Sequence, residues 1–100
     1  MPVLKNLIAT VHSGVAGPLI TVSGDANQKD SSGKAELKKR VPQGINPSIL
    51  LLDLENAEEK IPENWQKVSF NENVKHANQY EKVSVMVGST TIETIEVKKQ

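Results

Sequence analysis

The chain of 100 residues contains no cysteine and only three aromatic residues, Trp65, Phe70 and Tyr80. The absence of cysteine excludes disulfides, thiol nucleophiles and thiolate metal sites, and it fits a reducing compartment. Because three rings must help to fill a core, few remain for the stacking platforms that bind sugars or single-stranded nucleic acids. These absences remove several classes of binding and catalytic chemistry.

Net charge is also absent, since twelve basic residues balance twelve acidic ones. No overall field therefore attracts nucleic acid or an anionic membrane, and no apolar run is long enough to span a bilayer. We expect one soluble domain over residues 1–100, without a nucleic-acid or membrane partner. The segment 1–6 lacks the basic and long apolar regions of a secretory signal, so we expect a cytoplasmic location.

The most apolar stretch of the chain is 49–54, preceded by a turn signal at Asn46-Pro47. A short continuous apolar run is typical of a strand covered on both faces, although a buried helix gives the same pattern. The helix alternative has a good N-cap and a proline suited to the first helical position. Against it, Asp53 would lie among the leucines of the apolar face. We predict a strand over 48–54, with a turn or short helix over 55–60.

Six further segments have the alternation or β-branched composition that indicates strands. They cover residues 3–12, 19–24, 34–41, 66–71, 82–87 and 90–98. We expect Ile20 and Val22 to face the core, and the polar stretch 25–33 to form an exposed, mobile loop. Lys39 falls among the apolar positions of its segment, which is typical of an edge strand. Trp65 is expected to cover one end of the core.

The clearest supersecondary signal is a hairpin at the end of the chain. Gly88-Ser89 fits a two-residue turn of type II′ between the last two segments. Unbroken pairing from this turn would place two glutamates opposite each other. A one-residue bulge near Glu93-Thr94 removes this like-charge pair and places Val83 opposite Ile95. We predict the bulge.

Seven short segments with frequent turn signals predict an all-β fold, an antiparallel two-sheet β-sandwich. The strand count is that of an immunoglobulin-like or fibronectin-type-III-like sandwich. Tyr80 precedes the valines of 83–87, as a tyrosine opens a late strand in those folds, but its odd spacing points it to the opposite face. The likeness is one of architecture, and architecture does not convey function.

The motifs that would carry catalysis are incomplete. Gly33-Lys34 lacks the hydroxyl residue and the upstream glycine of a phosphate loop. The polar residues of 25–36 lack the turn glycine and one ligand of an EF-hand loop. His12 and His76 are the only imidazoles, and no spacing joins either to a base and an orienting group. We therefore expect no catalytic, metal-binding or cofactor-binding residue, and no cofactor.

The composition favours a small non-enzymatic module that binds another protein or its own copy. Docking would use main-chain pairing along an edge strand, at 35–41 or 91–98. The alternative is a small ligand-binding protein or enzyme with a site near His12, Asp25 and His76, brought together at one end of the sandwich. A third interpretation is an accessory domain of a larger cell-surface or phage assembly.

Overall fold

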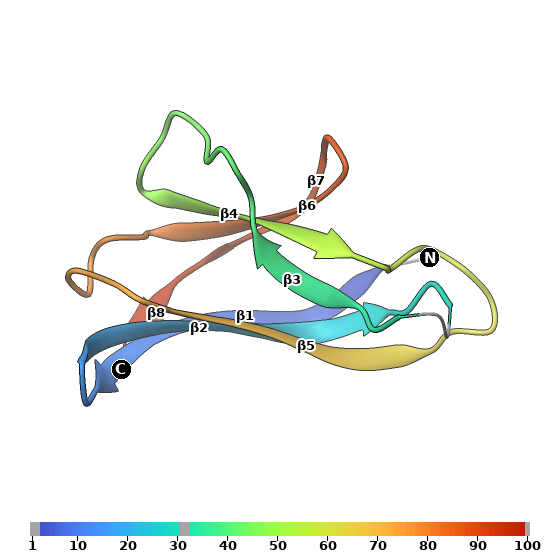
Figure 1. The fold of residues 1–100 in the computed structure, drawn as a ribbon, viewed down its shortest axis with the longest axis horizontal. Helices are drawn as coiled ribbons and strands as arrows, with labels where there is room; N and C mark the ends of the chain where they lie inside the picture. Colours follow the sequence, from blue (N-terminus) through green and yellow to red (C-terminus); the bar gives the residue numbers. More distant parts are fainter. Residues whose placement is uncertain (1–2, 31–32, 100) are drawn as a thin grey trace.

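A computed structural model describes residues 3–30 and 33–99. These residues form eight strands in two sheets that stack face to face (Figure 1). The strands are β1 (Leu4–Gly14), β2 (Gly17–Asn27), β3 (Glu36–Lys39), β4 (Ile49–Glu55), β5 (Trp65–Asn73), β6 (Lys82–Val87), β7 (Thr90–Glu96) and β8 (Lys98–Lys99). No helix in the described part of the chain is long and apolar enough to cross a membrane.

The predicted β-sandwich is confirmed, with strand orders β5-β2-β1-β8 and β3-β4-β6-β7. The last predicted segment divides into β7 and β8, so there is one strand more than expected. The expectation of purely antiparallel sheets is wrong, because β8 runs parallel to β1 and β6 runs parallel to β4. After β4 the chain crosses to the other sheet as β5, and this crossover allows β6 to return beside β4 in the same direction.

The leucine-rich stretch is strand β4, as predicted, and it lies between β3 and β6. Leu50, Leu52 and Leu54 face the core, whereas Ile49, Leu51 and Asp53 are half-buried on the outer face. On that face Leu51 contacts the segment that joins β3 to β4. Its backbone N–H and C=O form hydrogen bonds with the Gln43 side chain, and its own side chain lies next to Gly44. Glu55 is the last residue of β4, and residues 56–60 form a bend, an isolated bridge at Ala57 and irregular backbone, not a helix.

The core fills the space between the two sheets. Its fully buried large apolar side chains come from three inner strands: Ile20 and Val22 of β2, Leu50 and Leu52 of β4, and Val83 and Val85 of β6. The predicted inward orientation of Ile20 and Val22 is confirmed. Each such side chain stabilises the fold by roughly 1.5–3 kcal/mol relative to an exposed position.

A bulge in β1 decides which of its residues enter the core. The pairing register with β2 shifts around Asn6, whose φ is 56°. Because of this shift Leu4 and Leu7 are both buried although they are three residues apart, and Ile8 is left 57% exposed. Gly24 faces the bulge from β2, where an added Cβ would lie 3.3 Å from Cα of Leu7.

The polar stretch 25–33, of which residues 31–32 lie outside the described part of the chain, differs from its predicted form because β2 continues through Asn27. The Asn27 side chain is 0% exposed. Its Oδ1 accepts from the backbone N–H of Asn64 at 2.8 Å, and its Nδ2 donates to the carbonyl of Lys60 at 3.2 Å. These bonds replace the hydrogen bonds to water that the Asn27 amide loses on burial. A polar residue is therefore compatible with the buried end of this strand.

Two further expectations about single residues are only partly met. β3 is an edge strand, as the position of Lys39 predicted, but it is only four residues long and Val41 beyond it is 89% exposed. Trp65 begins β5 and is half-buried. Its ring centroid lies 4.1 Å from Nζ of Lys5, and it is not one of the residues of the core cluster.

The C-terminal hairpin follows the prediction closely. Val87 pairs with Thr90 across the two-residue turn, and Gly88 has a φ of 61°, as a type II′ turn requires. Val83 lies opposite Ile95, as predicted. The bulge is present, but the unpaired residue is Ile92, one position before the predicted site.

Candidate functional site

The structure places His12 and Asp25 toward opposite ends of the β1–β2 pair. His12 lies opposite Leu19, with its Nε2 3.3 Å from Oγ1 of Thr21, whereas Asp25 lies opposite Lys5. The step from Leu19 to Asp25 along β2 corresponds to about 20 Å at ~3.3 Å per residue. These two side chains therefore do not meet in one site.

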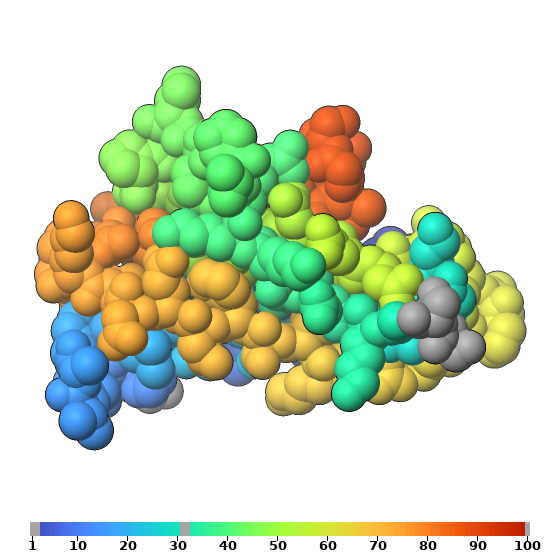
Figure 2. Space-filling view, viewed as in Figure 1, coloured from blue at the N-terminus to red at the C-terminus, as the bar shows by residue number. Residues whose placement is uncertain are grey.

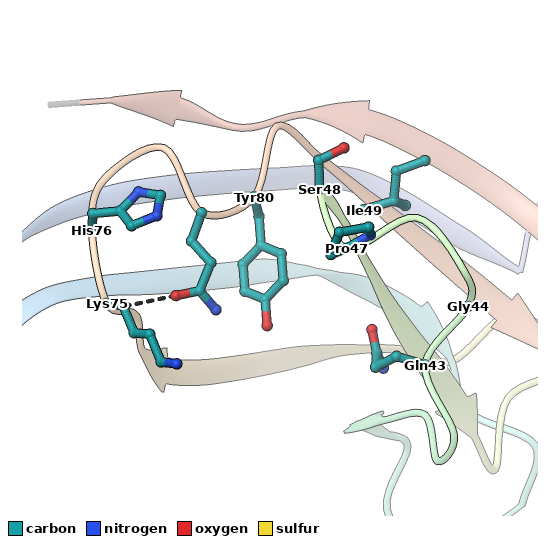
Figure 3. A pocket seen from close by; sticks show the side chains of 9 residues that line it. Gln43, Gly44, Pro47, Ser48, Ile49, Lys75, His76 and Tyr80 are labelled. Carbon is teal, nitrogen blue, oxygen red and sulfur yellow. Dashed lines mark hydrogen bonds between the residues drawn. The ribbon is translucent and has the colours of Figure 1, made fainter.

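His76 lies in the exposed connection between β5 and β6, where it lines an open cleft of about 540 Å³ (Figure 3). Two connections form the walls of this cleft, one before β4 and one before β6. The lining residues are Gln43, Gly44, Pro47, Ser48, Ile49, Lys75, His76, Gln79 and Tyr80. Of the three residues expected to form a ligand site, only His76 lines this cleft.

The polar groups of this cleft are mostly occupied in holding its walls. Gln43 donates to the carbonyl of Arg40 at 2.7 Å, and Gln79 accepts from the backbone N–H of Lys75 at 2.7 Å. The side chains left to meet a ligand are Lys75 and His76, beside the buried ring of Tyr80. Among the described residues that line the cleft there is no carboxylate. Lys75 brings a positive charge to this cleft.

No group of three or more histidine, aspartate or glutamate side chains that could hold a metal ion occurs within 3–30 and 33–99.

One side of the sandwich, where β3 and β5 are the edge strands, is closed by a charged cluster. Glu72 accepts from Nζ of Lys39 at 2.7 Å and from the hydroxyl of Tyr80 at 2.9 Å. The hydrogen bond from Lys39 to Glu72 raises the pKa of Lys39 above 10.5. This cluster joins the two sheets and places an inward-directed charge at the β3 edge, which discourages pairing with another strand.

On the other side of the sandwich, β7 is the edge strand of its sheet. The pairing of β7 with β6 determines which way the backbone groups of β7 point. Hydrogen-bonded and non-hydrogen-bonded pairs alternate along an antiparallel ladder. Val97 donates to the carbonyl of Glu81 at 2.9 Å, so the pair two residues away, Val83 and Ile95, is also hydrogen-bonded. The intervening position, Thr94, then has its N–H and C=O directed away from β6.

The side chains support this alternation. Residues of a non-hydrogen-bonded pair approach more closely than those of a hydrogen-bonded pair. The hydroxyl oxygens of Ser84 and Thr94, which lie opposite each other, are 2.8 Å apart. Thr94 therefore presents its main-chain groups to the open side of β7.

An apolar hollow of about 280 Å³ lies between β7 and β1 on this side. It is lined by Leu7, Ile8, Ala9, Ile95, Glu96 and Lys98. β8 pairs with β1 at Thr10 and Val11, and within residues 3–30 and 33–99 no strand pairs with the earlier part of β1 on this side. Four of its lining residues are apolar, and one acidic and one basic residue complete the lining.

Sequence reasoning identified the segment 91–98 as an edge but gave no sign of this hollow. The hollow depends on the bulge at Asn6, which orients Leu7 and Ile8, and on the short pairing of β8. Both are consequences of tertiary pairing, and no local pattern encodes them. The other predicted edge, 35–41, is the short β3 beside the charged cluster.

Comparison with protein-family models, with curated proteins and with solved structures finds no match to this chain. The immunoglobulin-like or fibronectin-type-III-like architecture therefore stays a prediction.

Proposed function

We propose that this protein is a non-enzymatic interaction module that binds an extended segment of another protein chain along β7. The observation that supports the proposal is an open strand edge beside an apolar hollow. In strand addition, main-chain hydrogen bonds supply affinity, and pockets for alternate side chains supply specificity. Thr94 offers the main-chain groups, and the hollow next to Ile95 accepts one side chain of the bound segment.

Of the two edges that the sequence predicts, β7 suits docking better than β3. β3 has four residues and a lysine tied to the opposite sheet, whereas β7 has seven residues, most of them β-branched. The bound segment would carry a branched aliphatic side chain in the hollow. Its polar residues would alternate with apolar ones, because β-strand side chains point to alternate faces. We place this function in the cytoplasm, since a chain without cysteine suits a reducing compartment.

The experiment compares two substitutions at one residue. Thr94→Pro and Thr94→Val both remove the hydroxyl that meets Ser84, but only proline removes the outward N–H. Peptides selected from a random displayed library on the native protein should bind Thr94→Val nearly as well as the native chain. We expect their affinity for Thr94→Pro to fall by at least tenfold, because one main-chain bond is lost and the ring obstructs the edge.

Circular dichroism and urea unfolding establish that both variants are folded before binding is compared. Selected peptides that bind Thr94→Pro as tightly as the native protein would contradict the proposal. A selection that yields no binding peptide would also count against it.

A further inference from the structure

Glu93 differs from the other half-buried acidic residues in having no partner within the described part of the chain. Four acidic residues are half-buried: Asp25, Asp53, Glu72 and Glu93. The first three are bound by Asn6, Arg40 and Lys39, at 2.9, 2.6 and 2.7 Å respectively. Within residues 3–30 and 33–99, no hydrogen bond or ion pair reaches the side chain of Glu93. Because a charge that loses part of its water needs a partner, a cation from outside the chain would stabilise this carboxylate.

Glu93 lies on the same face of β7 as the apolar hollow. It is opposite Val85, which is fully buried in the core, and residues directly opposite each other in an antiparallel pair share a face. Ile95, two residues further along the strand, shares this face and lines the hollow. β7 is the edge of its sheet, and the turn before it projects from the surface, in red in Figure 2. An unpaired carboxylate therefore stands at an open edge beside the hollow.

The other charged residues at this edge are Glu96 and Lys98, which line the hollow. Glu96 lies opposite Lys82, a side chain of opposite charge on the neighbouring strand. Along the chain Lys98 follows Ile95, whereas Glu93 precedes it. A docked segment therefore meets a negative charge at the Glu93 end of the hollow and a positive charge at the Lys98 end.

Resting on the strand-docking function above, we propose that Glu93 binds a lysine or arginine of the docked segment, two positions from the aliphatic residue in the hollow. In a strand paired along β7, the residues opposite Glu93 and Ile95 are two positions apart and point to the same face. Side chains of opposite charge that face each other across two strands attract, and like charges repel. The partner is thus a segment in which one residue separates a basic residue from an aliphatic one.

The charge of Glu93 also specifies how the segment is aligned on β7. A shift by two residues would bring the basic side chain beside the apolar Ile95 and take it away from Glu93. Electrostatic complementarity acts more on register and on the choice of partner than on affinity. Main-chain bonds to Thr94 would therefore hold the segment, and Glu93 would select among segments.

The peptides that the native protein selects from the random displayed library test this inference. We expect them to be enriched in a basic residue two positions from an aliphatic one. Their affinity should fall about tenfold in Glu93→Lys and about threefold in Glu93→Gln, because a favourable cross-strand pair becomes a like-charge or a neutral one. Calorimetric titration measures the affinities, after urea unfolding has shown that both variants are folded.

Glu58→Lys is the matched control, because it makes the same change in net charge at an exposed residue of the connection between β4 and β5. It should leave the affinity within about twofold of the native value, since salt screens a distant surface charge. A peptide whose basic residue is replaced by glutamate should show the reverse preference and bind Glu93→Lys more tightly than the native protein.

The outcomes separate this inference from the docking function on which it rests. Peptides that bind Glu93→Lys as tightly as the native protein, but lose affinity for Thr94→Pro, would overturn the role of Glu93 and leave the docking edge in place. Equal losses in Glu93→Lys and Glu58→Lys would also overturn it, because net charge alone would then explain the effect. Peptides insensitive to both Glu93→Lys and Thr94→Pro would overturn the two proposals together.

Discussion

Asn27 is the residue that most directly connects the strands to the segments around them. Its side chain bonds Lys60 and Asn64, its backbone N–H donates to the carbonyl of Val3 at 2.8 Å, and its carbonyl accepts from Glu58 at 3.0 Å. A single buried residue thus fixes three separate parts of the chain. Removing one member of such a set leaves the other buried polar groups without partners.

Asn27→Ala should therefore destabilise the fold by about 1–3 kcal/mol, because the N–H of Asn64 and the carbonyl of Lys60 lose their partner. Urea unfolding followed by circular dichroism measures the change. Asn71→Ala is the control, since Asn71 is an exposed asparagine on β5, and it should change stability by less than ~0.5 kcal/mol. Equal effects of the two substitutions would show that the Asn27 bonds do not support the fold.

Lys39 predicts a pH dependence at the residue scale. Its pKa is raised in the folded protein by the hydrogen bond to Glu72, and its ordinary value is 10.5. A raised folded pKa gives a stabilisation that is complete below pH 10.5 and is lost as the pH rises through the folded pKa. Because the side chain is 38% exposed, solvent screening limits this contribution to less than ~1 kcal/mol.

Lys39→Met should consequently lower the free energy of unfolding at neutral pH, and the difference from the native protein should shrink above pH 10.5. Urea unfolding at a series of pH values between about 7 and 11.5 measures both curves. Lys75→Met, at an exposed position of the β5–β6 connection, is the control. A difference that stays constant across this pH range would show that Lys39 acts through packing alone.

At the scale of elements, local patterns predicted those features that depend on near neighbours. The hairpin turn at Gly88-Ser89 and the opposition of Val83 and Ile95 were predicted because turn chemistry and a like-charge clash specify them. The bulge falls at Ile92, one residue early, since either position removes the clash. The extension of β2 to Asn27 was missed because the hydrogen-bond partners of the Asn27 side chain lie more than thirty residues away.

The β1 bulge gives a prediction at the same scale. A Cβ at Gly24 would lie 3.3 Å from the Lys5 carbonyl oxygen and from Cα of Leu7, and backbone atoms cannot move aside as a side-chain tip can. Gly24→Ala should therefore destabilise the protein by about 1–3 kcal/mol, the usual cost of overpacking. Thermal unfolding measures the effect, with the neighbouring Ser23→Ala as control. A stabilised Gly24→Ala would mean that β1 is not bulged against this residue.

At the scale of the whole molecule, the sandwich could be predicted from alternation, but the parallel pairing could not. A strand shows the same alternation whether its neighbour is parallel or antiparallel. The pairing of β4 with β6 is decided by the passage of β5 through the opposite sheet, which no local residue encodes. The same limit applies to the site. Hydrophobic pattern placed 91–98 at an edge, whereas the hollow beside Ile95 depends on how β1, β7 and β8 meet.

Residue-resolved amide hydrogen exchange by NMR along β7 shows whether this strand is an open edge. If β7 is an unpaired edge, the amide of Ile95 is protected by β6 and that of Val97 by its bond to Glu81, whereas the amide of Thr94 exchanges quickly into solvent. We expect this alternation in dilute protein without a partner. An amide of Thr94 as strongly protected as that of Ile95 would mean that another strand already covers this edge, and it would contradict the proposed docking surface.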